Sequence, residues 1–148
     1  MVTDCLTCEY NQNPTKSPGG WIKEYKYWIL EHTNEPIPIN GWLVLKTKRH
    51  TEGVVGINSD ESSELGTILD IVPKILKELT DSEMVYILCL TEKVKHLHFQ
   101  LIPRYKTQTR LGLDLLKLCD EVKEGKIKPV DISEVIKLTE SLRKRLEK

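Results

Sequence analysis

One segment constrains the fold more than any other, because polar and apolar residues alternate along it: His96-Leu97-His98-Phe99-Gln100-Leu101-Ile102-Pro103-Arg104. Alternation with a period of two is typical of a β-strand that turns one face to the core. It places His96, His98 and Gln100 on one face, so that three nitrogen-bearing side chains converge on one spot. This convergence indicates a functional site, and the alternative is the solvated face of an edge strand.

A second pattern combines cysteines with histidines. Cys5 and Cys8 form a Cys-x-x-Cys motif, and His50 follows the apolar run 42–45. Two thiolates and two imidazoles are a ligand set that binds zinc tetrahedrally, with Zn–S bonds of about 2.3 Å. We expect a structural zinc ion held by Cys5, Cys8, His50 and His96, gathered by tertiary structure. A redox pair of cysteines is the alternative, but such motifs usually lie at a helix start, which the neighbouring residues do not suggest.

These motifs together resemble the histidine triad (HIT) superfamily of nucleotide hydrolases and transferases. The resemblance spans about residues 5–104 and rests on Cys5-x-x-Cys8, on the segment 41–50 and on His96-x-His98-x-Gln100-x-x-Pro103-Arg104. It implies that His98 is the nucleophile that takes up the α-phosphorus of a nucleotide. It also implies that His96 joins zinc with His50 and the two cysteines, and that the protein forms a homodimer.

The chain departs from the family pattern at two places. Gln100 stands where the third histidine is usual, which is the pattern of the galactose-1-phosphate uridylyltransferase branch and some others. The Gly-Gln-Ser/Thr-Val tetrapeptide before the triad reads Thr-Glu-Lys-Val at 91–94, so Lys93 replaces a phosphate-contacting hydroxyl. Asn34 aligns with the residue that contacts the nucleotide ribose, and its amide both donates and accepts hydrogen bonds. The alternative for Asn34 is an ordinary turn residue before Pro36.

The remaining candidate residues surround the phosphate. Gln100 would donate an amide N–H to a nonbridging phosphate oxygen without carrying charge or titrating near neutral pH. Lys93 and Arg104 are candidates for further phosphate contacts. For all three, the alternative is a solvated polar residue on or beside a strand.

Composition excludes some functions and leaves others open. The 148 residues suit one domain, predicted to span 1–148 with a HIT-like core at about 5–104. Lys plus Arg equals Asp plus Glu at 22 each, so net charge gives no argument for broad nucleic-acid binding.

The longest apolar runs are strand-length and no signal-type segment is evident, so we expect a cytoplasmic protein with no membrane span. Cys89 and Cys119 lie in apolar runs, where free cysteine behaves as a small hydrophobe.

The hydrophobic pattern predicts an α+β architecture with a meandering antiparallel sheet of about five strands. The predicted strands cover 21–25, 27–32, 43–46, 84–90 and 95–103. A helix over 60–79 begins after Asn58, has a capping pattern and carries Pro73, which should kink it. A helical C-terminal extension over 105–148 ends in a helix from about residue 132.

The function predicted from these residues is hydrolysis or nucleotidyl transfer at the α-phosphate of a nucleoside phosphate derivative. Such substrates include dinucleoside polyphosphates and nucleoside phosphoramidates, and the reaction would pass through a nucleotide bound covalently to His98. Gln100 favours transfer over hydrolysis within this class. The alternative is a zinc-stabilised nucleotide-binding protein with little or no turnover.

Overall fold

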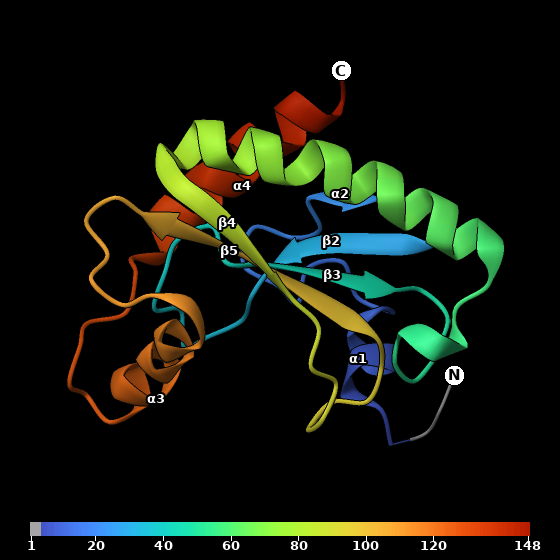
Figure 1. The fold of residues 1–148 in the computed structure, drawn as a ribbon, viewed down its shortest axis with the longest axis horizontal. Helices are drawn as coiled ribbons and strands as arrows, with labels where there is room; N and C mark the ends of the chain where they lie inside the picture. The colour runs from blue at the N-terminus through green and yellow to red at the C-terminus, as the bar shows by residue number, and fades with distance from the viewer. Residues whose placement is uncertain (1–3) are drawn as a thin grey trace.

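A computed structural model describes residues 4–148 and confirms the predicted α+β architecture (Figure 1). Five antiparallel strands form one sheet in the order β1-β2-β3-β5-β4. The strands are β1 (Lys23–Glu24), β2 (Trp28–His32), β3 (Leu43–Thr47), β4 (Ser82–Leu88) and β5 (His98–Tyr105). The α-helices are α1 (Leu6–Tyr10), α2 (Ser59–Thr80), α3 (Lys117–Lys123) and α4 (Ile132–Leu146), and short 3-10 helices cover Val54–Gly56 and Gly112–Leu116.

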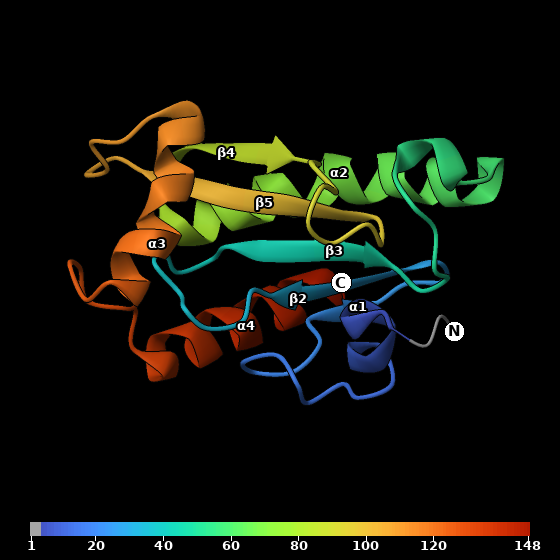
Figure 2. The ribbon, with the colours of Figure 1, turned by 90° about the horizontal axis from the view of Figure 1, so that it is seen from below.

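The helices lie on opposite sides of the sheet. Figure 1 shows α2 and α4 together on one face, and Figure 2 views the sheet from the side of α1 and α3. The main core lies between the sheet and the α2–α4 layer, and a smaller core lies under α3. Strand residues that face the main core include Trp28, Leu30, Leu43, Leu45 and Leu101, all fully buried. Burial of this apolar face is the main force that holds the sheet to its helices.

The pairing of β3 with β5 sets which side chains share the other face. In this register Lys46 lies opposite His98, and Val44 lies opposite Gln100. On the neighbouring strand β2, Glu31 lies opposite Val44. Because side chains alternate across a sheet, these residues all point away from α2 and α4. The polar face predicted for residues 96–100 is therefore the face that α1 and α3 flank.

Helix α2 begins as the sequence predicts. The side chain of Asn58 accepts a hydrogen bond from the Glu61 backbone N–H, and the Glu61 carboxylate accepts one from the Asn58 backbone N–H. This capping box satisfies donors that a helix start leaves unpaired. The helix is continuous through Pro73, whose nitrogen has no hydrogen to donate to the preceding turn. Within residues 4–148, no helix combines the length and apolar character needed to cross a membrane.

Three strands have bounds that differ from the prediction by two residues or more, and one of them is β4, predicted over 84–90 and found over Ser82–Leu88. Strand β1 covers two residues, and β5 begins at His98 where the alternation predicted a start near residue 95. A strand needs a paired neighbour, and the pairing of β5 with β3 ends where His98 lies opposite Lys46, one residue before the end of β3. His96 lies beyond this end and forms an isolated bridge with Glu52. Its backbone is thus held by the segment after β3, whereas its side chain bonds to Thr47 at the end of β3.

The C-terminal helices are packed into the two cores. Val135, Leu138, Leu142 and Leu146 of α4 are buried, as their helical spacing predicts. Three of them join the main core beside α2, whereas Leu118 of α3 joins the smaller core. Residues 105–148 therefore contribute to the same fold as the segment that carries the motifs.

Glu61 provides a test of this fold through its charge. Its carboxylate accepts two hydrogen bonds from Arg49 at 3.0 Å, and these bonds hold the pKa of Glu61 below its usual value despite burial. Because the folded-state pKa is lowered, the Glu61 carboxylate stabilises the folded protein at pH values above its unfolded-state pKa of about 4.5. This stabilisation is lost as the pH falls through the lower folded-state pKa. We expect Glu61→Gln to lower the free energy of unfolding by about 1 kcal/mol at pH 7.

The deficit should be smaller at pH 3 than at pH 7, as measured by urea unfolding at both pH values. Asp70→Asn is the control, because the Asp70–Lys74 pair is exposed and worth little. An equal deficit for Glu61→Gln at both pH values would contradict the charge-based account.

Candidate functional site

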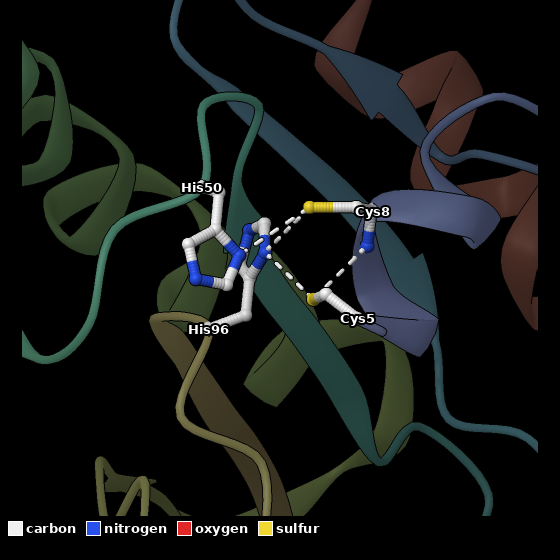
Figure 3. A group of neighbouring side chains, drawn as sticks. All are labelled: Cys5, Cys8, His50 and His96. Carbon is white, nitrogen blue, oxygen red and sulfur yellow. Dashed lines mark hydrogen bonds between the residues drawn. The ribbon is translucent and has the colours of Figure 1, made fainter. Parts of the chain in front are cut away.

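The predicted metal ligands lie together in the structure. One ligand atom from each of Cys5, Cys8, His50 and His96 lies within 4.8 Å of the other three. Both sulfurs point toward the two imidazole rings, as Figure 3 shows. The His96 Nδ1 atom is 3.5 Å from Cys5 Sγ and 3.6 Å from Cys8 Sγ, and His50 Nδ1 is 3.4 Å from Cys8 Sγ.

These distances match those of a tetrahedral centre. With Zn–S and Zn–N bonds of ordinary length, the edge between a sulfur and a nitrogen ligand is about 3.6 Å. The donor set of two thiolates and two imidazoles is also one that zinc favours. The residues present therefore fit a metal ion of this kind.

Helix α1 positions both sulfurs. Cys5 is the N-cap of α1, and its Sγ accepts a hydrogen bond from the Cys8 backbone N–H at 3.4 Å. Asn11 ends the helix and donates its side-chain N–H to the Thr47 carbonyl at 3.1 Å, which anchors α1 to the end of β3. The expectation that the Cys-x-x-Cys motif does not begin a helix is wrong, because a thiol can cap a short helix that no hydrophobic repeat announces.

The orientation of His96 follows from its other ring nitrogen. Nε2 lies 2.8 Å from the Thr47 carbonyl, which can only accept, so Nε2 carries the hydrogen and donates it. Burial lowers the pKa of His96, and the neutral ring keeps its lone pair on Nδ1, the atom that faces the cysteines. A hydrogen bond on the far nitrogen is how proteins orient metal-binding histidines. Among residues 4–148, His50 has no such hydrogen bond on its far nitrogen, since the nearest carboxylate oxygen, of the exposed Glu52, is 3.7 Å from Nε2.

His98 lies next to this cluster and lines a separate cavity of about 340 Å³. Its Nδ1 is 2.9 Å from the His96 carbonyl, which again only accepts, so Nδ1–H donates and neutral Nε2 holds the lone pair. The cavity is lined by α1, the ends of β2 and β3, the loop over residues 33–36 and α3. Its size suits a small organic ligand such as a mononucleotide.

Gln100 is oriented by a tryptophan. The indole Nε1–H of Trp42 donates to the Gln100 side-chain oxygen at 2.8 Å. Because an indole nitrogen is only a donor, the oxygen of the amide must face Trp42, which leaves the amide N–H groups free to donate elsewhere. Gln100 follows His98 by two residues on the same strand face, so their Cα atoms are about 6.7 Å apart.

The three polar residues of the segment 96–100 thus occupy different surroundings. His96 belongs to the Cys/His cluster, His98 lines the cavity and Gln100 bonds to Trp42. The alternation predicted that they converge on one spot. In the structure His98 and Gln100 share a strand face, whereas the His96 ring turns to the cysteines because His96 lies outside the regular strand.

The other predicted substrate-binding residues, Asn34, Lys93 and Arg104, also lie in different places in the structure. Asn34 lines the His98 cavity. Lys93 lines a neighbouring cavity beside the Cys/His cluster, and Arg104 lies toward the far end of β5, opposite Met84. The predicted roles of these three residues in binding phosphate or ribose stay predictions.

Sequence reasoning missed several polar residues that line the cavity, among them Glu31, His32 and Lys46. His32 accepts the Gly41 backbone N–H at its Nε2 and donates from Nδ1 to the Thr33 carbonyl, which holds the loop that carries Asn34. Burial lowers the pKa of His32, so the ring stays neutral as these bonds require. Glu31 and Lys46 form a buried ion pair of 2.6 Å. The available signal was that a charged residue interrupts each of two apolar strand runs.

Comparisons with known proteins identify the fold. No family model matches the chain, and no curated protein matches it significantly in sequence. Among solved structures, it is similar to a zinc-bound histidine triad family protein from Mycobacterium smegmatis, with 14% identity, 97% of this chain and 96% of the other covered, and a TM-score of 0.72. It is also similar to a hypothetical histidine triad nucleotide-binding protein from Sulfolobus tokodaii, with 15% identity, 97% of this chain and 92% of the other covered, and a TM-score of 0.71.

A diadenosine triphosphate hydrolase from Plasmodium falciparum is also similar, with 15% identity, 86% of this chain and 76% of the other covered, and a TM-score of 0.62. The chain therefore has the fold of histidine triad proteins, as the sequence motifs indicate.

Proposed function

We propose that this chain is a histidine triad enzyme that cleaves a nucleoside phosphate derivative at its α-phosphorus. The observation that carries the proposal is the tautomer of His98: its Nδ1–H is tied to a backbone carbonyl, and its Nε2 lone pair belongs to a residue that lines a nucleotide-sized cavity. Nucleotide-acting proteins among the structural neighbours support the same reading.

His98 Nε2 acts as the nucleophile in the proposed reaction. Its lone pair forms a bond to the α-phosphorus, while the bond from phosphorus to the leaving group breaks and the leaving group departs with that electron pair. A water molecule or a second phosphate then attacks phosphorus and releases His98. The hydrogen bond from Nδ1 to the His96 carbonyl raises the population of the tautomer whose lone pair lies on Nε2. It also stabilises the imidazolium cation that forms on attack.

Gln100 donates an amide N–H to a nonbridging oxygen of the α-phosphate in this proposal. The bond from Trp42 holds the amide oxygen away from phosphate, so only the donor end faces the negatively charged group. Asn34 contacts the ribose hydroxyls from the loop that His32 holds. Lys93 and Arg104 are further candidates for the phosphates of the leaving group.

The Cys/His cluster binds zinc in a structural role. Four protein ligands leave no position for a reactive water, so the ion contributes stability and not a nucleophile. It would fix α1 against the residues that precede His98. We further propose a homodimer, as the resemblance implies. Strand β4 is an edge strand of the sheet, so its free backbone edge offers a second chain a place to pair.

The metal assignment is tested by elemental analysis. Protein made in zinc-supplemented medium should contain about one zinc per chain. The combined change Cys5→Ser and Cys8→Ser should lower both the zinc content and the melting temperature, because binding energy at a structural site is folding energy. Cys89→Ser is the control and should keep the metal. Metal-free wild-type protein, or unchanged stability after loss of both thiols, contradicts a structural zinc.

The nucleophile is tested by His98→Ala. Turnover of dinucleoside polyphosphates and nucleoside phosphoramidates should be lost, while zinc content and nucleotide binding stay close to wild type, because the cavity side and not the core loses atoms. Mass spectrometry of wild-type protein quenched during turnover should find an acid-labile nucleoside monophosphate on the peptide that contains His98. An active variant excludes the mechanism, and nucleotide binding by a wild-type protein without turnover identifies a binding protein instead.

The donor role of Gln100 is tested by single-turnover rates between pH 5 and pH 9. Gln100→Ala should slow the chemical step by roughly 10²–10³-fold, the usual cost of losing one such donor. Gln100→His should retain part of the rate and add a pH dependence near the imidazole pKa. Trp42→Phe keeps an aromatic side chain but removes the indole N–H that holds the Gln100 amide oxygen. It should slow the reaction less than Gln100→Ala. Wild-type rates in both Gln100 variants would mean that Gln100 is only a polar strand residue.

A further inference from the structure

A buried ion pair forms part of the wall of the His98 cavity. Lys46 Nζ lies 2.6 Å from Glu31 Oε1, and only 2% and 6% of the respective side chains are exposed. Both residues line the cavity together with His98 and Asn34. None of the steps proposed above uses this pair.

The sheet register locates the pair relative to the nucleophile. Lys46 is the cross-strand partner of His98, but its ammonium reaches toward Glu31 on β2, on the side of β3 that lies away from β5. The strand order β2-β3-β5 therefore separates the paired charges from the position of the phosphate. Leu6 and Tyr10 of α1 line the cavity as well. The part of a bound nucleotide that extends away from His98 would meet these residues and the ion pair.

Stability does not account for the pair. Taking two charges out of water costs several kcal/mol per ion, and replacement of a buried pair by apolar residues of similar volume is often neutral or stabilising. Ile29 is the cross-strand neighbour of Lys46 and is buried, so an apolar side chain would also suit this position. A pair of fixed charges in a ligand cavity supplies something that apolar residues cannot, namely a donor and an acceptor at set positions.

We propose that Glu31 and Lys46 bind the hydrogen-bonding edge of the base of the nucleotide and make the site selective for one type of edge. This inference rests on the proposed function, since it concerns the same cavity. Adenine offers an exocyclic N–H donor beside a ring nitrogen acceptor, whereas hypoxanthine offers a carbonyl acceptor beside a ring N–H donor. The carboxylate only accepts and the ammonium only donates, so a fixed pair satisfies one order of groups and leaves the other unpaired. Buried polar groups left unpaired are what gives a site its strongest discrimination.

Adenosine and inosine monophosphates form the matched probe pair, because they differ only at this edge. The wild-type protein should bind one of them at least about tenfold more tightly, the equivalent of one charge-assisted hydrogen bond. Ribose 5-phosphate, which has no base, should bind more weakly than the preferred nucleotide. Isothermal titration calorimetry measures all three affinities.

The variant carries Glu31→Leu and Lys46→Met together, since a single change would leave the other charge buried without its partner. It should bind both nucleotides within about twofold of each other. The matched control removes an ion pair outside the cavity, with Asp70→Leu and Lys74→Met on the exposed surface of α2, and should keep the wild-type ratio. Circular dichroism and zinc content show that each variant is folded. If the double variant does not fold, Glu31→Gln in the same titration should reduce the ratio, because the amide presents a donor as well as an acceptor.

The outcomes separate this inference from the proposed function. Equal affinities for the two nucleotides in the wild-type protein, or a ratio that survives loss of the ion pair, overturns base recognition by Glu31 and Lys46 while turnover through His98 stands. Absence of binding for all three probes overturns base recognition, whereas the proposed function fails only if the wild-type protein turns over none of the nucleoside phosphate derivatives. A ratio that collapses only in the cavity variant supports the inference.

Discussion

The antiparallel pairing of β3 with β5 is the constraint on which the site depends. It sets Val44 opposite Gln100 and ends with Lys46 opposite His98, so that His50 and His96 meet beyond the ladder. Because side chains alternate with a period of two, a shift of one residue would turn His98 into the core and Phe99 into the cavity. Burial of Leu43, Leu45, Phe99 and Leu101 against α2 and α4 makes that shift costly, so the hydrophobic core holds the polar face in register.

The Cys/His cluster and the cavity are joined through one backbone carbonyl. The ring of His96 points its Nδ1 at the cysteines, while its carbonyl accepts the Nδ1–H of His98. The same residue therefore belongs to the cluster and selects the tautomer of its neighbour. A structural metal in this position would act on the chemistry only indirectly, by fixing the segment that orients His98.

The polar contacts around the cavity show where sequence reasoning stops. Trp42 and Gln100 are 58 residues apart, and nothing in the local sequence of either indicates their hydrogen bond. Glu31 and Lys46 look like solvated residues of half-exposed strands, yet both are buried and pair with each other in the wall of the cavity. The cap of α1 by Cys5 is equally invisible, since a helix of five residues has too few positions to show a repeat.

The sequence by itself determined the elements whose signal is local. Period-two alternation specified the strand that carries His98 and Gln100, period 3.6 with an Asn58 capping box specified α2, and the cysteine spacing with two histidines predicted the metal-type cluster. Only the tertiary structure decided where β5 begins, that the His96 ring turns to the cysteines, which ring nitrogen each histidine presents, and that a buried ion pair lines the cavity. The physical reason is that strand ends, tautomers and burial depend on partners distant in the chain, and those partners meet only when the sheet is assembled.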